Sequence, residues 1–257
     1  MFEARLTNAG LLKKILESVK DLLTDANLVC TEDGILLQAM DAAHVSLITF
    51  TLLTDAFSLY TCTDTITLGV NTVVFARILK CADNTDSVLL RTVDDGKLHI
   101  TFESQSGQRT SEFQMNLMEI DGDHISIPDT EYTCSVKMPS GDFTRIVRDL
   151  QAFGETATVA VEGEMVRFTA TGDAGTASIA VKADKTAKAE TEWTEIECGE
   201  PTAMDFALRY LSSFTKGQGI ADQVTLFMTT GMPIYVTYDM GDLGSVGYYL
   251  APKVHED

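Results

Sequence analysis

Two segments decide the fold, Gly10–Leu16 (GLLKKIL) and Gly141–Val147 (GDFTRIV). They have the same spacing of apolar residues and lie 131 positions apart in the chain. Two further matches follow in the same order, at offsets of 132 and 136: Phe75–Leu79 with Ala207–Leu211, and Leu98–Glu103 with Ile234–Asp239. Any one of these matches could arise by chance. Three matches in one order at similar offsets predict a chain built from a duplicated domain.

Each half is predicted to run strand, helix, several strands, helix and several strands. The 3.6-residue period of apolar side chains indicates helices over about residues 9–23, 72–80, 141–150 and 205–216. In the second helix, Val74, Ile78 and Leu79 are expected to face inward, and Gly217 is interpreted as the C-cap of the fourth. Short β-branched and aromatic segments such as Val88–Val93 predict the strands. The predicted fold class is α+β, with two similar domains of antiparallel sheets and two helices each.

The two halves are separated by a segment without helical period. Asp121–Asp129 carries turn formers and acids, so it is interpreted as an extended interdomain connector. The predicted organisation is an N-terminal domain over residues 1–117, a connector over 118–134 and a C-terminal domain over 135–257.

The composition is that of a globular protein with a strongly acidic balance. The chain has 257 residues, 45% of them apolar, and a net charge of −19. A protein this acidic repels phosphates, so it can bind nucleic acid only where the charge is locally reversed. Its five cysteines form no C-x-x-C pair, which favours reduced thiols in an intracellular protein over disulfides or a zinc site. We see no signal-peptide pattern and no apolar run near the roughly 18 residues that span a membrane.

Positive charge is concentrated on the predicted helices. Windows 11–21, 72–80, 141–150 and 205–216 hold nine bases and five acids, a net charge of +4, whereas the rest of the chain has a net charge of −23. The nine bases are Lys13, Lys14, Lys20, Arg77, Lys80, Arg145, Arg148, Arg209 and Lys216. One interpretation is the ordinary solvation of exposed helix faces. The other is that the helices line one surface facing a polyanion, where Lys and Arg contact phosphates without reading sequence.

Catalytic motifs are absent from the sequence. It contains no G-x-S-x-G, G-x-x-x-x-G-K-[ST], G-x-G-x-x-G or H-E-x-x-H, and no two of its four histidines stand at metal-ligand spacing. Asp121, Asp123 and Asp129 could hold a hard cation, but they lack the order of a calcium-binding loop. A metal-dependent hydrolase is thus supported by carboxylate abundance alone, and we expect no enzyme activity, metal or cofactor.

Seven strings resemble a single family from one end of the chain to the other. They are Met1–Leu6, Gln38–Leu47, Ile78–Ala82, Lys137–Phe143, Arg145–Leu150, Phe206–Leu211 and Tyr248–Lys253. On these strings the chain resembles the proliferating cell nuclear antigen family of eukaryotic DNA sliding clamps. The resemblance implies two similar α+β domains joined by a long connector. It also implies that three subunits close head to tail into a ring, with strands outside and helices lining the hole.

The function implied by the resemblance is that of a processivity factor. A nuclear homotrimer would encircle double-stranded DNA without reading its sequence, and would need a clamp loader to open it. It would recruit replicative polymerases, nucleases and ligases, and would not associate with membranes. Because a closed ring holds DNA by topology, weak contacts from the nine helix bases would suffice.

The resemblance also assigns two kinds of protein contact. The strand near Phe113 and Met115 would meet the strand near Ile179 and Val181 of the next subunit, although from sequence alone both could be internal strands. Partner proteins would insert a motif with apolar and aromatic anchors into a groove beneath the connector. The groove positions carried over are Met40, His44, Val45, Leu47, Ile125, Ile127, Pro128, Pro233, Tyr249, Leu250, Ala251 and Pro252. Without the resemblance, most of these would be interpreted as core residues.

Two positions depart from the family pattern. Gly163 stands where the family usually carries a lysine that accepts ubiquitin or a related modifier, which removes that acceptor from this loop. Ala152 stands where a histidine is often found on a DNA-facing helix. Two alternatives stay beside the homotrimeric clamp: a subunit of a heterotrimeric checkpoint clamp, and a monomeric acidic interaction module that never meets DNA.

Overall fold

The structure is a computed structural model that describes residues 1–93, 96–121 and 130–254. The chain divides into two compact units. The first unit comprises residues 1–42, 48–126 and 240–246, and the second comprises residues 43–47, 127–239 and 247–257. Each unit thus includes a short segment from the opposite half of the chain.

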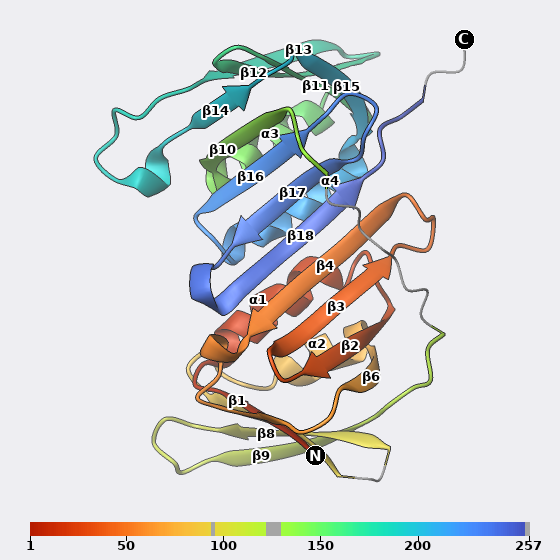
Figure 1. The fold of residues 1–257 in the computed structure, drawn as a ribbon, viewed down its shortest axis with the longest axis vertical. Helices are drawn as coiled ribbons and strands as arrows, with labels where there is room; N and C mark the ends of the chain where they lie inside the picture. The colour runs from red at the N-terminus through yellow and green to blue at the C-terminus, as the bar shows by residue number, and fades with distance from the viewer. Residues whose placement is uncertain (94–95, 122–129, 255–257) are drawn as a thin grey trace. The chain divides into compact units, whose positions relative to one another are not determined.

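The order of secondary-structure elements repeats between the two halves (Figure 1). The N-terminal half forms, in chain order, β1 (Phe2–Leu6), α1 (Ala9–Val19), β2 (Asp25–Thr31), β3 (Gly34–Met40), β4 (Ser46–Leu53), η1 (Thr54–Ala56), β5 (Leu59–Cys62), β6 (Ile66–Asn71), α2 (Thr72–Leu79), β7 (Ser87–Val93), β8 (Lys97–Glu103) and β9 (Thr110–Asn116). The C-terminal half forms β10 (Cys134–Pro139), α3 (Ser140–Gln151), β11 (Thr156–Glu162), β12 (Met165–Gly172), β13 (Gly175–Lys182), η2 (Glu190–Glu192), β14 (Glu195–Cys198), β15 (Thr202–Ala207), α4 (Leu208–Phe214), η3 (Thr215–Gly219), β16 (Gln223–Met228), β17 (Ile234–Asp239), η4 (Gly241–Leu243) and β18 (Gly244–Leu250).

Strand pairing repeats in the same way. The N-terminal half has the strand orders β5-β1-β7-β8-β9 and β4-β3-β2-β6, and the C-terminal half has β14-β10-β16-β17-β18 and β13-β12-β11-β15. The three sequence matches fall in corresponding elements, namely α1 with α3, α2 with α4, and β8 with β17. The duplication predicted from the sequence is therefore confirmed by the topology.

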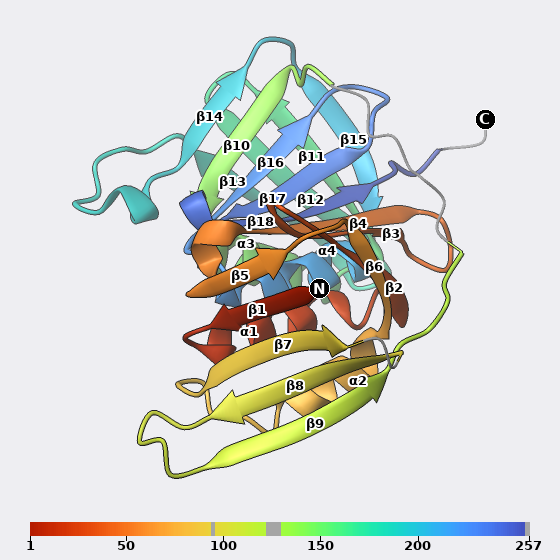
Figure 2. The same ribbon diagram turned by 60° about the horizontal axis from the view of Figure 1, so that its bottom comes forward.

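The two helices of each unit pack against each other and against strands. In the first unit α1 contacts α2, and α2 contacts β2, β6 and β9. Figure 2 shows β7, β8 and β9 side by side in this unit. In the second unit α3 contacts α4 and β12. Asparagine begins both helices of the first unit, because the Oδ1 atoms of Asn8 and Asn71 accept backbone N–H groups of the first helical turn.

The third predicted helix is confirmed in position. Helix α3 buries Phe143, Ile146, Val147 and Leu150 and leaves the basic side chains of its other face exposed. In the second helix the expected orientation of Val74 is wrong. Val74 is 40% exposed, whereas Phe75, Ala76 and Leu79 fill the buried face.

The start and the end of the fourth predicted helix both differ from the expectation. Residues 205–207 belong to β15, where Asp205 is the register partner of Thr158 in β11, so α4 begins only at Leu208. Gly217 is not a left-handed C-cap. It lies in η3, where an added Cβ atom would come within 2.2 Å of the Tyr238 ring. Glycine is needed there for close packing, not for its backbone freedom.

Candidate functional site

The basic side chains of the first unit are partly neutralised by neighbouring groups. Glu17 pairs with the Nζ atoms of Lys20 at 2.7 Å and Lys80 at 3.1 Å. Desolvation raises the pKa of Glu17, but its hydrogen bonds and charge interactions with these lysines outweigh it and hold the pKa below its usual range. Lys13 Nζ donates a hydrogen bond to the Ala82 carbonyl oxygen at 2.7 Å.

Three other bases keep an unpaired charge. Lys14 on α1, Arg77 on α2 and Arg145 on α3 are exposed, and their charged groups have no ion pair or hydrogen bond to any described residue. These side chains are the ones most available to a phosphate, because no protein carboxylate has to be displaced first.

The remaining bases of the second unit have local contacts. Arg148 pairs with the adjacent Asp149 at 3.1 Å, and the Arg209 guanidinium lies 4.9 Å from the ring centroid of Tyr210. Lys216 is exposed and lies in η3. Within the observed bounds of α1 to α4 there are six bases and three acids, a net charge of +3, because Asp21, Asp205, Lys20, Lys80 and Lys216 lie outside these helices.

Strands β9 and β13 each end a sheet. β9 is the last strand in the order β5-β1-β7-β8-β9, and β13 is the last in β13-β12-β11-β15. The interpretation of both as internal strands is therefore wrong for the part of the chain that the structure describes. Phe113 is half-buried with its ring centroid 5.5 Å from that of Phe102, and Ile179 and Val181 are also half-buried. Met115 is only 4% exposed, so its side chain is committed to the core of its own unit.

The elements that correspond to β13 and β9 in the duplicated fold are β4 and β18. In the second unit the Ala251 N–H donates to the Val45 carbonyl at 3.1 Å, and Ser46 Oγ donates to the Tyr249 carbonyl at 2.9 Å. In the first unit Gly244 approaches β4 so closely that a Cβ atom would lie 1.9 Å from the carbonyl oxygen of Thr51. The two strands are thus held side by side at both ends.

A row of aromatic rings lies beside the C-terminal end of β18 in the second unit. Tyr249 stacks on Tyr235 with ring centroids 4.3 Å apart, Tyr235 stacks on Phe227 at 5.8 Å, and Phe227 lies 5.5 Å from Tyr132. Burial raises the pKa of Tyr132 and of Tyr249, so both phenols stay neutral at physiological pH. Of these four rings, the sequence resemblance identified only Tyr249.

The other predicted groove residues divide by exposure. Leu47 and Leu250 are buried. His44 is exposed and has a φ of 54°, the only non-glycine positive φ among the described residues. Half-buried or exposed positions in the second unit are Val45, Pro233, Ala251 and Pro252, and Met40 is half-buried in the first unit. Ile125, Ile127 and Pro128 lie outside the described residues.

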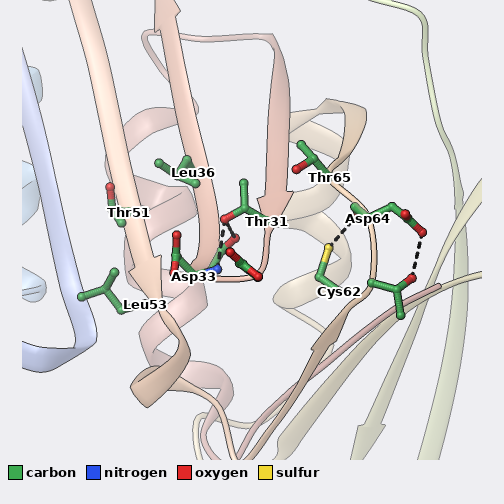
Figure 3. A pocket seen from close by; sticks show the side chains of 11 residues that line it. Thr31, Asp33, Leu36, Thr51, Leu53, Cys62, Asp64 and Thr65 are labelled. Carbon is green, nitrogen blue, oxygen red and sulfur yellow. Dashed lines mark hydrogen bonds between the residues drawn. The ribbon is translucent and has the colours of Figure 1, made fainter.

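A hollow of about 470 Å³ lies on the first unit between the β2–β3 turn and the loop after β5 (Figure 3). Asp33 and Asp64 line it, and no lysine, arginine or histidine is among its lining residues. Cys62 Sγ donates to the Asp64 carbonyl at 3.1 Å, and desolvation raises the pKa of this thiol. The lining of the hollow therefore combines carboxylates with a thiol that is not activated, and it has no cationic side chain.

Features expected of a metalloenzyme or a membrane-spanning protein are not found in the described parts of the chain. No group of three His, Cys, Asp or Glu side chains there could hold a metal ion. Asp123 and Asp129, two of the three acids considered as cation ligands, lie outside the residues that the structure describes. No described helix is long and apolar enough to cross a bilayer.

Comparison with known families gives the class of protein. Residues 1–125 match the family described as proliferating cell nuclear antigen, N-terminal domain, and residues 126–253 match its C-terminal domain. These matches place the chain among the DNA sliding clamps, which act in DNA replication and repair as scaffolds without catalytic activity. The chain belongs to the proliferating cell nuclear antigen family, as the seven sequence strings indicated.

Proposed function

We propose that three copies of this chain close head to tail into a ring that encircles duplex DNA in the nucleus. The observation that carries the proposal is a difference between two corresponding pairs of strands. β4 and β18 are held side by side within the chain, whereas their counterparts β13 and β9 are edge strands. A second copy that offered β13 to β9 would repeat the pairing of β4 with β18 and cover both edges.

The charge distribution supports sliding on DNA over tight binding. Three chains of net charge −19 give an assembly of −57, which repels DNA from most of its surface. The unpaired bases Lys14, Arg77 and Arg145 would supply weak phosphate contacts on the helices, while Glu17 moderates Lys20 and Lys80. Since each phosphate contact must break for the ring to advance, a small number of contacts favours rapid sliding.

Partner proteins would dock on the second unit beside β18. The half-exposed ring of Tyr249 stacks on Tyr235, which in turn stacks on Phe227. Val45 and Pro252 of the same unit are partly exposed. An apolar surface with rigid aromatic rings suits a short helical or extended motif with hydrophobic anchors. We infer that replicative polymerases, nucleases, ligases and the clamp loader use this surface.

The decisive test is DNA synthesis on circular and linear templates of equal length. A topological ring should support processive synthesis on a closed circle and be lost from a free linear end. Equal stimulation on both templates would contradict encirclement. Sedimentation at micromolar concentration should give a mass of three chains, and copurification with two unlike subunits would favour a heterotrimeric checkpoint clamp.

A matched pair of variants tests the helix bases. Combined substitution of Lys14, Arg77 and Arg145 by alanine should reduce processive synthesis at physiological salt. Combined substitution of three exposed bases outside the helices should leave it unchanged, namely Arg91, Lys137 and Lys188. Equal losses in both variants would show that general charge, not the helix faces, is responsible.

A further inference from the structure

Two of the five cysteines stand directly opposite each other in neighbouring strands. Cys134 begins β10, Cys198 ends β14, and the two are register partners in the antiparallel pairing of these strands. Their Sγ atoms are 3.3 Å apart, with Cys134 donating an S–H hydrogen bond to Cys198. They are 64 positions apart in the chain, so their spacing in the sequence does not suggest that they meet.

The backbone around this pair has the geometry of a disulfide. The Gly199 N–H donates to the Thr133 carbonyl at 2.8 Å, so the neighbouring residue pair is the hydrogen-bonded one. Cys134 and Cys198 therefore form a non-hydrogen-bonded pair, in which Cα atoms lie about 4.5 Å apart. That separation is within the range of about 4.4–6.8 Å found for disulfides. Bond formation requires the sulfur atoms to approach by only about 1.2 Å, without a change of register.

The two thiols differ in burial, and therefore in their access to an oxidant. Cys134 is buried and also donates to the Glu200 carbonyl at 3.0 Å. Burial, followed by the hydrogen bond with Cys198, raises the pKa of Cys134 to about 11, which keeps it a protonated thiol at neutral pH. Cys198 is half-buried on β14, the terminal strand of its sheet, so a small oxidant reaches Cys198 first.

We propose that Cys134 and Cys198 are a redox modification site that closes reversibly to a disulfide when the protein meets a peroxide. Hydrogen peroxide oxidises the Cys198 thiol to a sulfenic acid and releases one water. The Cys134 sulfur then attacks the Cys198 sulfur, so that the S–S bond forms and the S–O bond breaks. The hydroxide leaving group takes the Cys134 proton and departs as a second water. A dithiol returns the two electrons and restores both thiols.

The bond would tie β14 to β10 and close a loop that contains α3 and β11–β13. Such a loop restricts the unfolded chain, so the oxidised protein should unfold at a higher temperature than the reduced protein. The site lies within the second unit and does not depend on the ring proposed above.

Cys62 and Cys81 serve as internal controls, because their thiols donate to backbone carbonyls and not to a second sulfur. Cys62 donates to the carbonyl oxygens of Cys30 and Asp64, and Cys81 donates to the Arg77 carbonyl. Cys81 is exposed and its Sγ atom has no sulfur partner among the described residues, so peroxide should oxidise it without forming an intramolecular bond.

The experiment treats the full chain with hydrogen peroxide, blocks free thiols and maps tryptic peptides by mass spectrometry without reduction. The expected product links peptide 110–137, which carries Cys134, to peptide 189–209, which carries Cys198, and dithiothreitol should abolish it. Oxidation should raise Tm by several degrees in the parent protein and in Cys81→Ser, and have no such effect in Cys198→Ser.

Several outcomes would overturn the proposal. One is conversion of Cys198 to sulfinic or sulfonic acid with no cross-link. Another is a cross-link that joins Cys81 of two chains and excludes Cys134. A third is an equal rise of Tm in Cys198→Ser. Because Cys198 is half-buried, its serine variant should fold, which its reduced-state Tm checks independently.

Discussion

Replacing Gly217 by alanine should destabilise the second unit, although alanine normally favours helical backbone. The new Cβ atom would lie 2.2, 2.3 and 2.6 Å from three carbon atoms of the Tyr238 ring. Carbon atoms in ordinary contact are about 3.5–4.0 Å apart, so the ring would have to retreat by roughly 1 Å or more. Tyr238 is fully buried and packs edge-on against Tyr248 with ring centroids 6.4 Å apart, which leaves no space for that movement.

Overpacking of this kind costs about 1–3 kcal/mol. Urea denaturation of Gly217→Ala should therefore show a lower midpoint with an unchanged m-value, and Tm should fall by roughly 2–4 °C per kcal/mol. The matched control is Gly141→Ala near the start of α3. There the nearest atom to the new Cβ is Gln218 Nε2 at 3.5 Å, an ordinary contact. That variant should gain about 0.4–1 kcal/mol, because alanine reduces the freedom of the unfolded chain.

A third variant distinguishes packing from a left-handed cap. Asparagine tolerates the left-handed region better than alanine, so Gly217→Asn would recover stability relative to Gly217→Ala if the backbone required that conformation. Packing against Tyr238 predicts the reverse order, because asparagine is larger. Recovery by asparagine, or a neutral Gly217→Ala, would refute the reasoning.

Two further substitutions and one pH dependence follow from the polar contacts. On the proposed function, Glu17→Gln should release Lys20 and Lys80 from their ion pairs. The log–log slope of DNA affinity against salt concentration should then steepen by up to about 0.9 for each additional phosphate that these lysines neutralise. The free energy of unfolding should change by less than about 1 kcal/mol. Glu195→Gln, whose carboxylate pairs with a lysine away from the helices, is the control, and an unchanged slope in Glu17→Gln would contradict the assignment. Tyr238→Phe should raise the free energy of unfolding by about 1 kcal/mol in urea denaturation at pH 8, because the buried Tyr238 hydroxyl has no hydrogen-bond partner among the described residues. A destabilised variant would show that the hydroxyl does have a partner. Burial, followed by the charge of a neighbouring tyrosine, raises the pKa of Tyr238 well above its ordinary value near 10, so the folded state holds this proton more tightly than the unfolded state. That contribution is complete below pH 10 and is lost as the pH rises through 10 toward the folded pKa, so the stability of the parent protein should fall more steeply there than that of Tyr238→Phe.

Sequence periodicity predicted correctly those elements that are determined by interactions between residues close in sequence. Helix α3 was predicted correctly because its apolar stripe has a single period and no competing signal. The start of α4 was missed because residues 205–207 fit a helical period, while their pairing with distant β11 makes them a strand. Gly217 shows the same limit, since only the tertiary approach of Tyr238 explains it.

The candidate sites were predictable to different degrees. The basic residues were recognised from charge counting, but the ion pairs of Glu17 join α1 to the end of α2 and required the fold. Tyr249 was found by resemblance, whereas Tyr235 and Tyr132 come from other segments and join it only through packing. Cys134 and Cys198 meet across a strand pairing that no spacing rule reveals.

The uncovered edge strands β9 and β13 also leave a monomer of this chain open to the addition of further copies. Backbone groups that are complementary between copies will join at whatever angle the contact allows, and a contact that misses the closing angle grows into a fibre. Charged side chains such as Glu112 on β9 and Lys182 on β13 make indiscriminate strand addition less favourable. A copy outside the proposed ring would keep both edges open, and because the addition of one copy to another depends on concentration, fibre growth would become more favourable as the number of such copies rises.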